Sequence, residues 1–193
     1  SSIAMDATLF ARLEAVHQTR ETSGLTAEQQ RLTDRYYRQF VRFGAKLTGE
    51  QRAQMAQLTA REAELMTKFS QNLLADTAAW TLTLEATDLA GLPESTKSAA
   101  AQAAKDRGME GKYLITLQRP SVEPFLSYSE RRDLREKAWR AWIARGDNGN
   151  EFDNKAIIAE LVKLRADRAK LLGFEHHSAF VMNDSMAGSS QAA

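Results

Sequence analysis

The chain has 193 residues, of which 43 % are hydrophobic and 26 % are charged, a composition typical of a folded domain and not of a disordered segment. It contains no cysteine, which excludes disulfides, thiolate metal sites and a cysteine nucleophile. Its 26 Lys and Arg residues against 25 Asp and Glu residues leave a net charge of +1, too small for an overall electrostatic attraction to nucleic acid.

Three helices are predicted in the first part of the chain, where no proline occurs before Pro93 and helix-forming residues dominate. Apolar side chains recur there every three or four residues, the period of a helix with one buried face. We expect helices over residues 6–22, 26–43 and from 48 toward 91. Thr26 and Thr48 each stand three residues before a glutamine, the capping-box pattern that begins a helix. Because the connecting loops are short, we expect the three helices to pack antiparallel.

The period changes to two near Trp80, where apolar residues alternate with Thr and Glu. A second run rich in β-forming residues covers 113–117, and an Ala-rich helix is expected between the two runs, over residues 94–107. A two-stranded ribbon is marginal alone and must pack on helices. We therefore predict an antiparallel ribbon of residues 80–85 with 113–117, the only sheet in the chain.

Helices are expected to resume after the last proline, Pro124. The predicted ranges are 129–144, 154–172 and 178–182. No linker rich in Pro, Gly or Ser divides the chain, and no run of about 18 apolar residues is present that could cross a membrane. The sequence thus predicts a mostly α fold, a helical bundle lobe with one small ribbon, in which residues 1–193 form a single helical unit.

Histidine is scarce, and its spacing argues against a metal site. The chain has only His17, His176 and His177, whereas a helical zinc site needs two histidines four residues apart with a glutamate after the first. A solvated or capping role is expected for His176 and His177. The chain also lacks a Gly-x-Ser-x-Gly nucleophile elbow and a glycine-rich phosphate loop. We therefore assign no catalytic, cofactor-binding or metal-binding residue.

The strongest local feature is the segment 130–145, which carries six basic and three acidic residues with Trp139 and Trp142 between them. Cations interleaved with aromatic side chains are typical of a surface that binds single-stranded nucleic acid. Alternatively, Leu134, Ala138 and Trp142 form a core stripe, and the basic residues lie on the solvated face of the same helix. A local basic patch could also bind the carboxylate of a peptide, which arginine holds in bidentate fashion.

Short motifs spread over nearly the whole chain carry a family resemblance. They include, in order, residues 68–74 (KFSQNLL), 88–93 (DLAGLP), 108–117 (GMEGKYLITL), 132–136 (RDLRE), 149–154 (GNEFDN) and 164–174 (LRADRAKLLGF). In this order the motifs resemble the thimet-oligopeptidase-like zinc metallopeptidases, and within them the branch of peptidyl-dipeptidase and oligopeptidase A.

The resemblance implies an almost wholly helical fold with two lobes around a channel that admits short unstructured peptides. The family's zinc site is a helical His-Glu-x-x-His with a further glutamate downstream, a motif with no counterpart in this chain. The chain therefore resembles an internal segment of a longer enzyme, without zinc ligands of its own. Zinc is expected in the full-length parent, and this segment is expected to help wall the substrate channel and to be inactive alone.

Two functional hypotheses follow. The first is a segment of a zinc oligopeptidase of the peptidyl-dipeptidase type, with short peptides and the catalytic portion of the same polypeptide as partners. The alternative is a free-standing helical module that binds peptide or nucleic acid. Under the first, we expect no nucleic-acid partner, no membrane contact, and a cytoplasmic location with the periplasm as the alternative.

Self-association of the segment is also expected, because some apolar faces would pack on parts of the parent that the segment lacks. The apolar residues expected to be left without partners lie near the two ends of the chain. They are Ile3, Leu9, Phe10, Phe180, Val181 and Met182.

Overall fold

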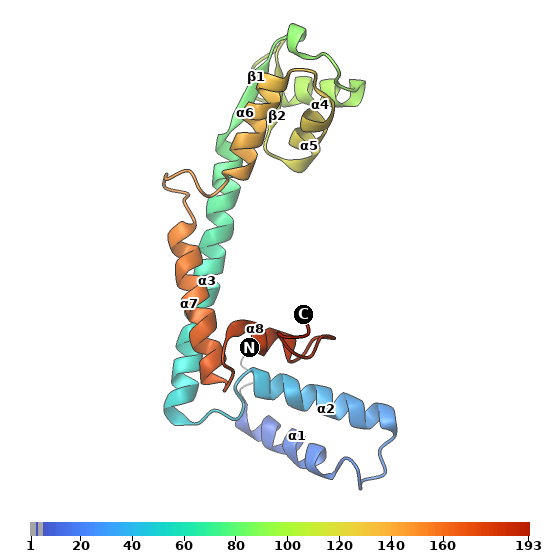
Figure 1. Cartoon of the computed structure of the whole chain (residues 1–193), viewed down its shortest axis with the longest axis vertical. Coiled ribbons are helices and arrows are strands. Elements are labelled where there is room, and N and C mark those ends of the chain that lie inside the picture. The colour runs from blue at the N-terminus through green and yellow to red at the C-terminus, as the bar shows by residue number, and fades with distance from the viewer. Residues whose placement is uncertain (1–2, 4–5) are drawn as a thin grey trace. The chain divides into compact units, whose positions relative to one another are not determined.

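A computed structural model describes residue 3 and residues 6–193 of the chain (Figure 1). The fold is mostly helical with one small sheet, as the sequence predicts, and its contacts divide it into two compact units. The first unit comprises the residues up to Ala63 together with Leu161–Ala193, and the second comprises Glu64–Glu160. That the whole chain behaves as a single helical unit stays a prediction. None of the helices in the described residues is long and apolar enough to cross a membrane.

The first unit begins with the helices α1 (Ala7–Thr19) and α2 (Ala27–Arg42). The carboxylate of Asp6 accepts hydrogen bonds from the first-turn amides and so caps α1. Thr26 caps α2 with a complete capping box, in which Gln29 donates to the Thr26 hydroxyl and the Gln29 side chain accepts from the Thr26 amide. The predicted helix starts at residues 6 and 26 are confirmed.

Aromatic stacking holds α1 against α2, and the two helices lie side by side (Figure 1). The ring of Phe10 stacks on Tyr37 and Phe40, with centroids 5.8 and 6.3 Å apart. His17, in the last turn of α1, stacks on Tyr37 at 3.8 Å and reaches Asp34 at 3.3 Å. Phe10 is the only buried residue of α1, so this contact between helices depends on a few rings.

The third helix, α3 (Gly49–Ala79), does not continue the antiparallel pair, and the predicted three-helix antiparallel bundle is wrong. Within the first unit α3 leaves α2 in a new direction (Figure 1). The turn between them is compact, with Ala45 and Leu47 buried in it. Gly44 takes a φ of +94°, and a Cβ there would lie 2.9 Å from the Leu47 side chain. This buried, left-handed turn fixes the exit direction of the chain, which the loop length alone does not reveal.

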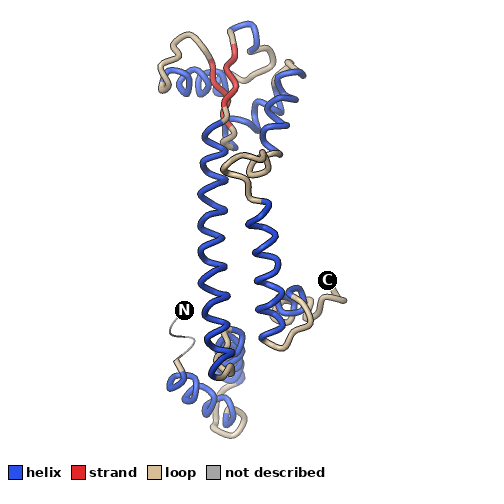
Figure 2. Tube along the Cα trace, turned by 90° about the vertical axis from the view of Figure 1, so that its left-hand side faces the viewer, coloured by secondary structure: helices blue, strands red, loops and turns tan. Residues whose placement is uncertain are grey.

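The second unit contains the predicted ribbon, drawn red in Figure 2. Strands β1 (Thr81–Leu84) and β2 (Tyr113–Thr116) pair antiparallel, with Thr81 opposite Thr116 and Leu84 opposite Tyr113. These are the only strands in the described residues. The predicted pairing of 80–85 with 113–117 is therefore confirmed, with each strand slightly shorter than expected.

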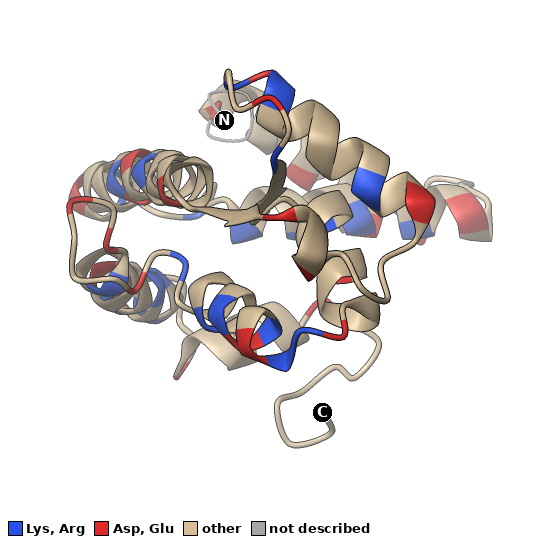
Figure 3. Cartoon of the chain, turned by 90° about the horizontal axis from the view of Figure 1, so that it is seen from above, with Lys and Arg blue, Asp and Glu red and all other residues tan. Residues whose placement is uncertain are grey.

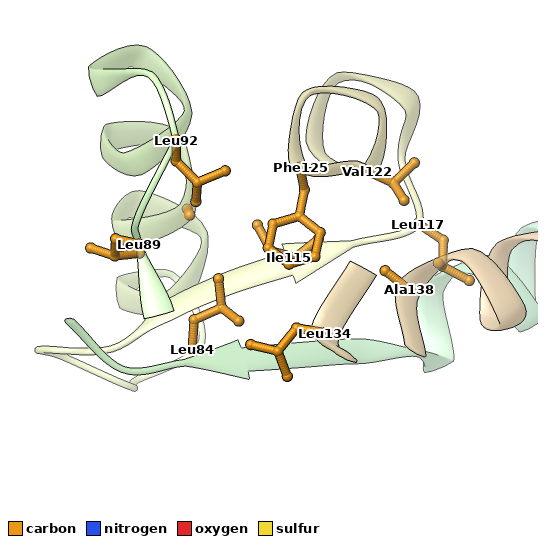
Figure 4. Packing of buried hydrophobic residues seen from close by; sticks show 10 residues of the cluster. Leu84, Leu89, Leu92, Ile115, Leu117, Val122, Phe125, Leu134 and Ala138 are labelled. Atoms are coloured by element: carbon orange, nitrogen blue, oxygen red, sulfur yellow. The ribbon is translucent and has the colours of Figure 1, made fainter. Parts of the chain in front are cut away.

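A continuous apolar core lies around the ribbon (Figure 4). Besides the short 3₁₀ helix η2 (Ala86–Asp88), the helices α4 (Glu94–Lys105), α5 (Arg119–Tyr128) and α6 (Arg132–Ile143) surround it. Leu84, Ile115 and Phe125 converge from β1, β2 and α5, and each is fully buried. The Ala-rich helix α4 packs directly on β2, as predicted.

Helix α5 was not predicted, because it contains two of the chain's three prolines. Pro120 occupies the first turn, where a missing amide costs little, and Pro124 lies inside the helix. Burial of Val122 and Phe125 compensates for the hydrogen bond that Pro124 cannot make. Ser129 ends α5 instead of capping the next helix, and its hydroxyl accepts from the Arg131 amide. The predicted helix 129–144 is therefore shorter, beginning at Arg132 as α6.

The last helices are α7 (Lys155–Leu171) and α8 (His177–Met182), close to the predicted ranges. The expectation that apolar residues near the ends lack partners is only partly confirmed. Ile3, Leu9 and Val181 are exposed, whereas Phe10 and Phe180 are buried. Phe10 finds its partners on α2, and Phe180 meets the ring of Phe174 edge to face at 5.4 Å. Self-association stays a prediction.

Candidate functional site

A hollowed face runs along α6 in the second unit. Two adjacent hollows of about 490 and 530 Å³ lie there, and both are lined by Leu126 of α5 and Trp139 of α6. The first hollow is completed by Arg132, Arg135 and Glu136, and the second by Leu73, Trp142, Ile143 and Arg145. We call this surface the α6 groove. Two arginines lie at its first end, Trp139 lies at its centre, and its second end is mostly apolar with Arg145 at the margin.

The position of the core decides which side of α6 carries the groove. Leu134 and Ala138 are buried against the ribbon, and Trp142 is half-buried at the edge of that core. Trp139 instead remains 49 % exposed and Ile143 61 % exposed. The predicted core stripe of Leu134, Ala138 and Trp142 is confirmed, and Trp139 lies outside it.

The electrostatics of the groove are positive. Within the described part of the chain Arg132 and Arg135 form no ion pair, whereas Glu136 is paired with Arg140 at 2.7 Å. Burial, and next the repulsion by Arg119, lower the pKa of the Arg145 guanidinium. Basic and acidic residues are otherwise interspersed along the helices (Figure 3), so the groove is a local excess of positive charge on a nearly neutral chain.

A larger pocket of about 740 Å³ lies in the first unit between α2, α3 and α8. Its charged end is already occupied by internal contacts. The Arg42 guanidinium lies 4.1 Å from the centroid of the Phe180 ring, donates to the Phe180 carbonyl at 2.8 Å and approaches Asp184 at 3.9 Å. Arg168, also a lining residue, is paired with Glu62 at 2.7 Å. Sequence reasoning missed this pocket, because its walls come from segments more than 100 residues apart.

A buried carboxylate, Asp76, organises the loop between α6 and α7. It accepts from the Gly146 amide at 2.7 Å and from the side chains of Asn148 and Asn150 at 2.8 and 3.1 Å. Burial raises the pKa of Asp76, but the hydrogen bonds from Gly146, Asn150 and Asn148 outweigh it, and the net pKa is below its usual value. All three donors are protein groups, so Asp76 is a structural anchor of the loop and not a free acid or base.

Two of the three histidines have a clear local structural role. His17 stacks on Tyr37, and His176 caps α8 by accepting from the Ala179 amide at 3.0 Å, the capping role that the sequence predicts. Burial, and next the nearby Arg168, lower the pKa of His177. Among the described residues no three His, Asp or Glu side chains are grouped so that they could hold a metal ion.

Comparison with known proteins identifies what the chain resembles. Residues 125–193 match Peptidase family M3. The chain is 38 % identical over 194 residues to a dipeptidyl carboxypeptidase of Salmonella typhimurium, which aligns with 100 % of this chain and 28 % of that protein. It is 35 % identical over 188 residues to oligopeptidase A of Haemophilus influenzae, covering 95 % of this chain and 28 % of the relative. An organellar oligopeptidase A of Arabidopsis thaliana is 32 % identical over 192 residues, covering 96 % and 24 %.

The resemblance inferred from the motifs is therefore confirmed. The chain is similar to a segment of peptidases named dipeptidyl carboxypeptidase and oligopeptidase A, and it spans about a quarter of the length of these curated relatives. The similarity extends over both compact units, so the ribbon, the α6 groove and the first-unit pocket all lie within the matched region.

Proposed function

We propose that this chain is a non-catalytic segment of a zinc-dependent oligopeptidase of the peptidyl-dipeptidase type, and that it helps to wall the channel for short peptide substrates. The observation that carries the proposal is the similarity along the full length of the chain to a dipeptidyl carboxypeptidase. The α6 groove adds support, because it offers cationic and aromatic groups to a peptide. A cytoplasmic location, with the catalytic portion of the same polypeptide as partner, is part of the proposal.

Zinc would be supplied with its ligands by another part of the longer protein. The described residues of this chain do not fit a zinc site, since a catalytic zinc needs three protein ligands in fixed geometry. We therefore assign no proton transfer and no metal contact to any residue of this chain. Its part in the reaction would be to bind and orient the peptide.

The test compares the 193-residue chain with a longer protein that includes a His-Glu-x-x-His segment. Both are assayed on a quenched fluorescent peptide with added zinc. We expect the longer protein to cleave the peptide and to lose activity with a chelator, and the 193-residue chain to show no turnover. Chelator-sensitive turnover by the pure 193-residue chain, or none by the longer protein, would refute the proposal.

The alternative is a module that binds peptides without any hydrolase attached to it. The exposure of Trp139 beside Arg132 and Arg135 favours it, since Trp and Arg are the residues that contribute most to binding interfaces. The same assay separates the two hypotheses. If the chain were only a binding module, neither the 193-residue chain nor the longer protein would cleave the peptide.

A further inference from the structure

The lining residues of the α6 groove form one stripe along the helix. On α6 they stand at positions 132, 135, 136, 139, 142 and 143, a spacing of three, one, three, three and one that keeps them on a single helical face. At about 1.5 Å of rise per residue, Arg135 lies about 6 Å and Arg132 about 10 Å along the axis from Trp139. The stripe thus presents two guanidinium groups at a fixed distance from an aromatic surface.

The free charge of this stripe is not matched from within the protein. Arg132 and Arg135 form no ion pair in the described part of the chain, and the one acid in the groove, Glu136, is engaged by Arg140. Arg145, which lines the second hollow, adds one cation at the other end of the groove, whereas Arg119 is paired with Glu123 at 2.8 Å. A ligand for this groove therefore needs carboxylates at the end near Arg132.

The centre and the far end of the groove need an apolar partner. Trp139 and Ile143 are half-exposed or more, and Leu73, Leu126 and Trp142 complete an apolar floor. Arginine forms bidentate hydrogen bonds with carboxylates, and an exposed tryptophan buries a large area against an apolar side chain. An extended peptide advances about 3.3 Å per residue, so two or three residues span the distance from Arg135 or Arg132 to Trp139.

We propose that the α6 groove binds an extended acidic segment of the substrate peptide, with one or two carboxylates held by Arg132 and Arg135 and a large apolar side chain, two or three residues away, resting on Trp139. The inference deepens the proposed function and rests on it for the identity of the ligand as a substrate. It assigns to this chain the selection of peptides by charge, a role distinct from the cleavage step.

The first experiment measures binding to the 193-residue chain by its tryptophan fluorescence. The probe is acetyl-Asp-Asp-Ala-Leu-Leu-amide, compared with the same peptide carrying Asn-Asn or Lys-Lys in place of Asp-Asp. We expect the Asp-Asp probe to bind about tenfold more tightly than the Asn-Asn probe, the Lys-Lys probe not to bind, and added salt to reduce the difference. Equal binding of the three probes, or no binding at millimolar concentration, would overturn the proposal.

Variants localise the effect. Arg132→Gln with Arg135→Gln should weaken binding of the Asp-Asp probe about tenfold and leave the Asn-Asn probe unchanged. Trp139→Ala should weaken both probes. Lys137→Gln is the control, because Lys137 lies about 200° around α6 from Arg135 and its substitution removes one positive charge from the same helix, against two in the arginine variant. All four positions are exposed or half-exposed, and far-UV circular dichroism confirms that each variant is folded. An equal effect of Lys137→Gln would place the binding elsewhere and contradict the proposal.

A second measurement separates this inference from the proposed function. In the longer protein, the double arginine variant should lose its preference for acidic over neutral peptides while keeping zinc-dependent cleavage of the neutral one. An unchanged preference refutes the role of the groove and leaves the hydrolase intact. Absence of cleavage in the unmodified longer protein refutes the proposed function, whatever the 193-residue chain binds.

Discussion

The two compact units of the chain are stabilised in different ways. The second unit encloses a core in which Leu84, Ile115 and Phe125 are wholly buried between a ribbon and three helices. In the first unit α1 buries one side chain, Phe10, and α2 buries none. The comparison teaches that helices of similar length can depend on quite different sources of stability, because α1 and α2 begin with side-chain caps whereas α4, α5 and α6 have none. We expect apolar burial to dominate in the second unit, and aromatic stacking and capping to matter most for the pair α1 and α2 of the first.

The largest expected effect tests the core of the second unit. Phe125→Ala should lower the free energy of unfolding by about 3–5 kcal/mol, because it removes a fully buried ring and leaves a cavity. Phe43→Ala in the first unit is the control and should cost less than about 1 kcal/mol, since that ring is 43 % exposed. Urea unfolding followed by circular dichroism measures both. Similar losses for the two variants would contradict the contrast between the units.

The ribbon and the Ala-rich helix could be predicted because their signals are local. Alternation near Trp80 and the turn-forming Gly108 mark the elements directly in the sequence. Helix α5 could not be found in this way, since Pro120 and Pro124 argue against a helix that only the burial of Phe125 makes favourable. Tertiary packing there overrides local preference.

The candidate site was predicted in part, for a related reason. The sequence identifies the basic and aromatic residues of α6, but the side of the helix that faces the core depends on contacts with the ribbon and α5. The sequence already places Trp142 with Leu134 and Ala138 on the core stripe, but only the fold shows that Trp139 is exposed beside Leu126 in a hollow of the surface. No local sequence pattern indicates that Asp76 anchors the loop between α6 and α7, because its partner Gly146 lies 70 residues away along the chain.

An intermediate effect concerns the polar part of the second unit. Asp76→Asn should cost about 2 kcal/mol at pH 7, because it removes the charge from a buried acceptor of three hydrogen bonds, one of them from the buried Gly146 amide. Since the folded-state pKa of Asp76 lies below the usual value of 3.8, its contribution is present above pH 4 and is lost as the pH falls below the folded-state pKa. The difference between the wild type and the variant should therefore shrink in acid.

Urea unfolding at pH 7 and at about pH 3 measures this dependence, with Asp106→Asn as the control. Asp106 is exposed at the end of α4, where its side chain accepts only from Gln102, and its loss should change the free energy of unfolding by less than about 0.5 kcal/mol. If Asp76→Asn left stability unchanged at pH 7, the loop between α6 and α7 would not depend on the buried carboxylate, and apolar burial alone would account for the second unit.

The smallest expected effect tests the first unit. Thr26→Ala should destabilise α2 by about 1 kcal/mol, because it removes the acceptor of the Gln29 amide and breaks the capping box. Thr33→Ala is the matched control on the same helix. The Thr33 hydroxyl bonds only to the carbonyl of Gln29 at 2.8 Å, and alanine is the better helix former, so this change should be neutral or slightly stabilising. Hydrogen exchange of the Gln29 and Gln30 amides measures the effect on the first turn of α2.

Faster exchange in Thr26→Ala alone would establish that capping limits the opening of α2. Faster exchange in both variants would indicate that α2 opens together with its packing on α1, and the contrast between capped and core-dependent helices would then fail for this unit.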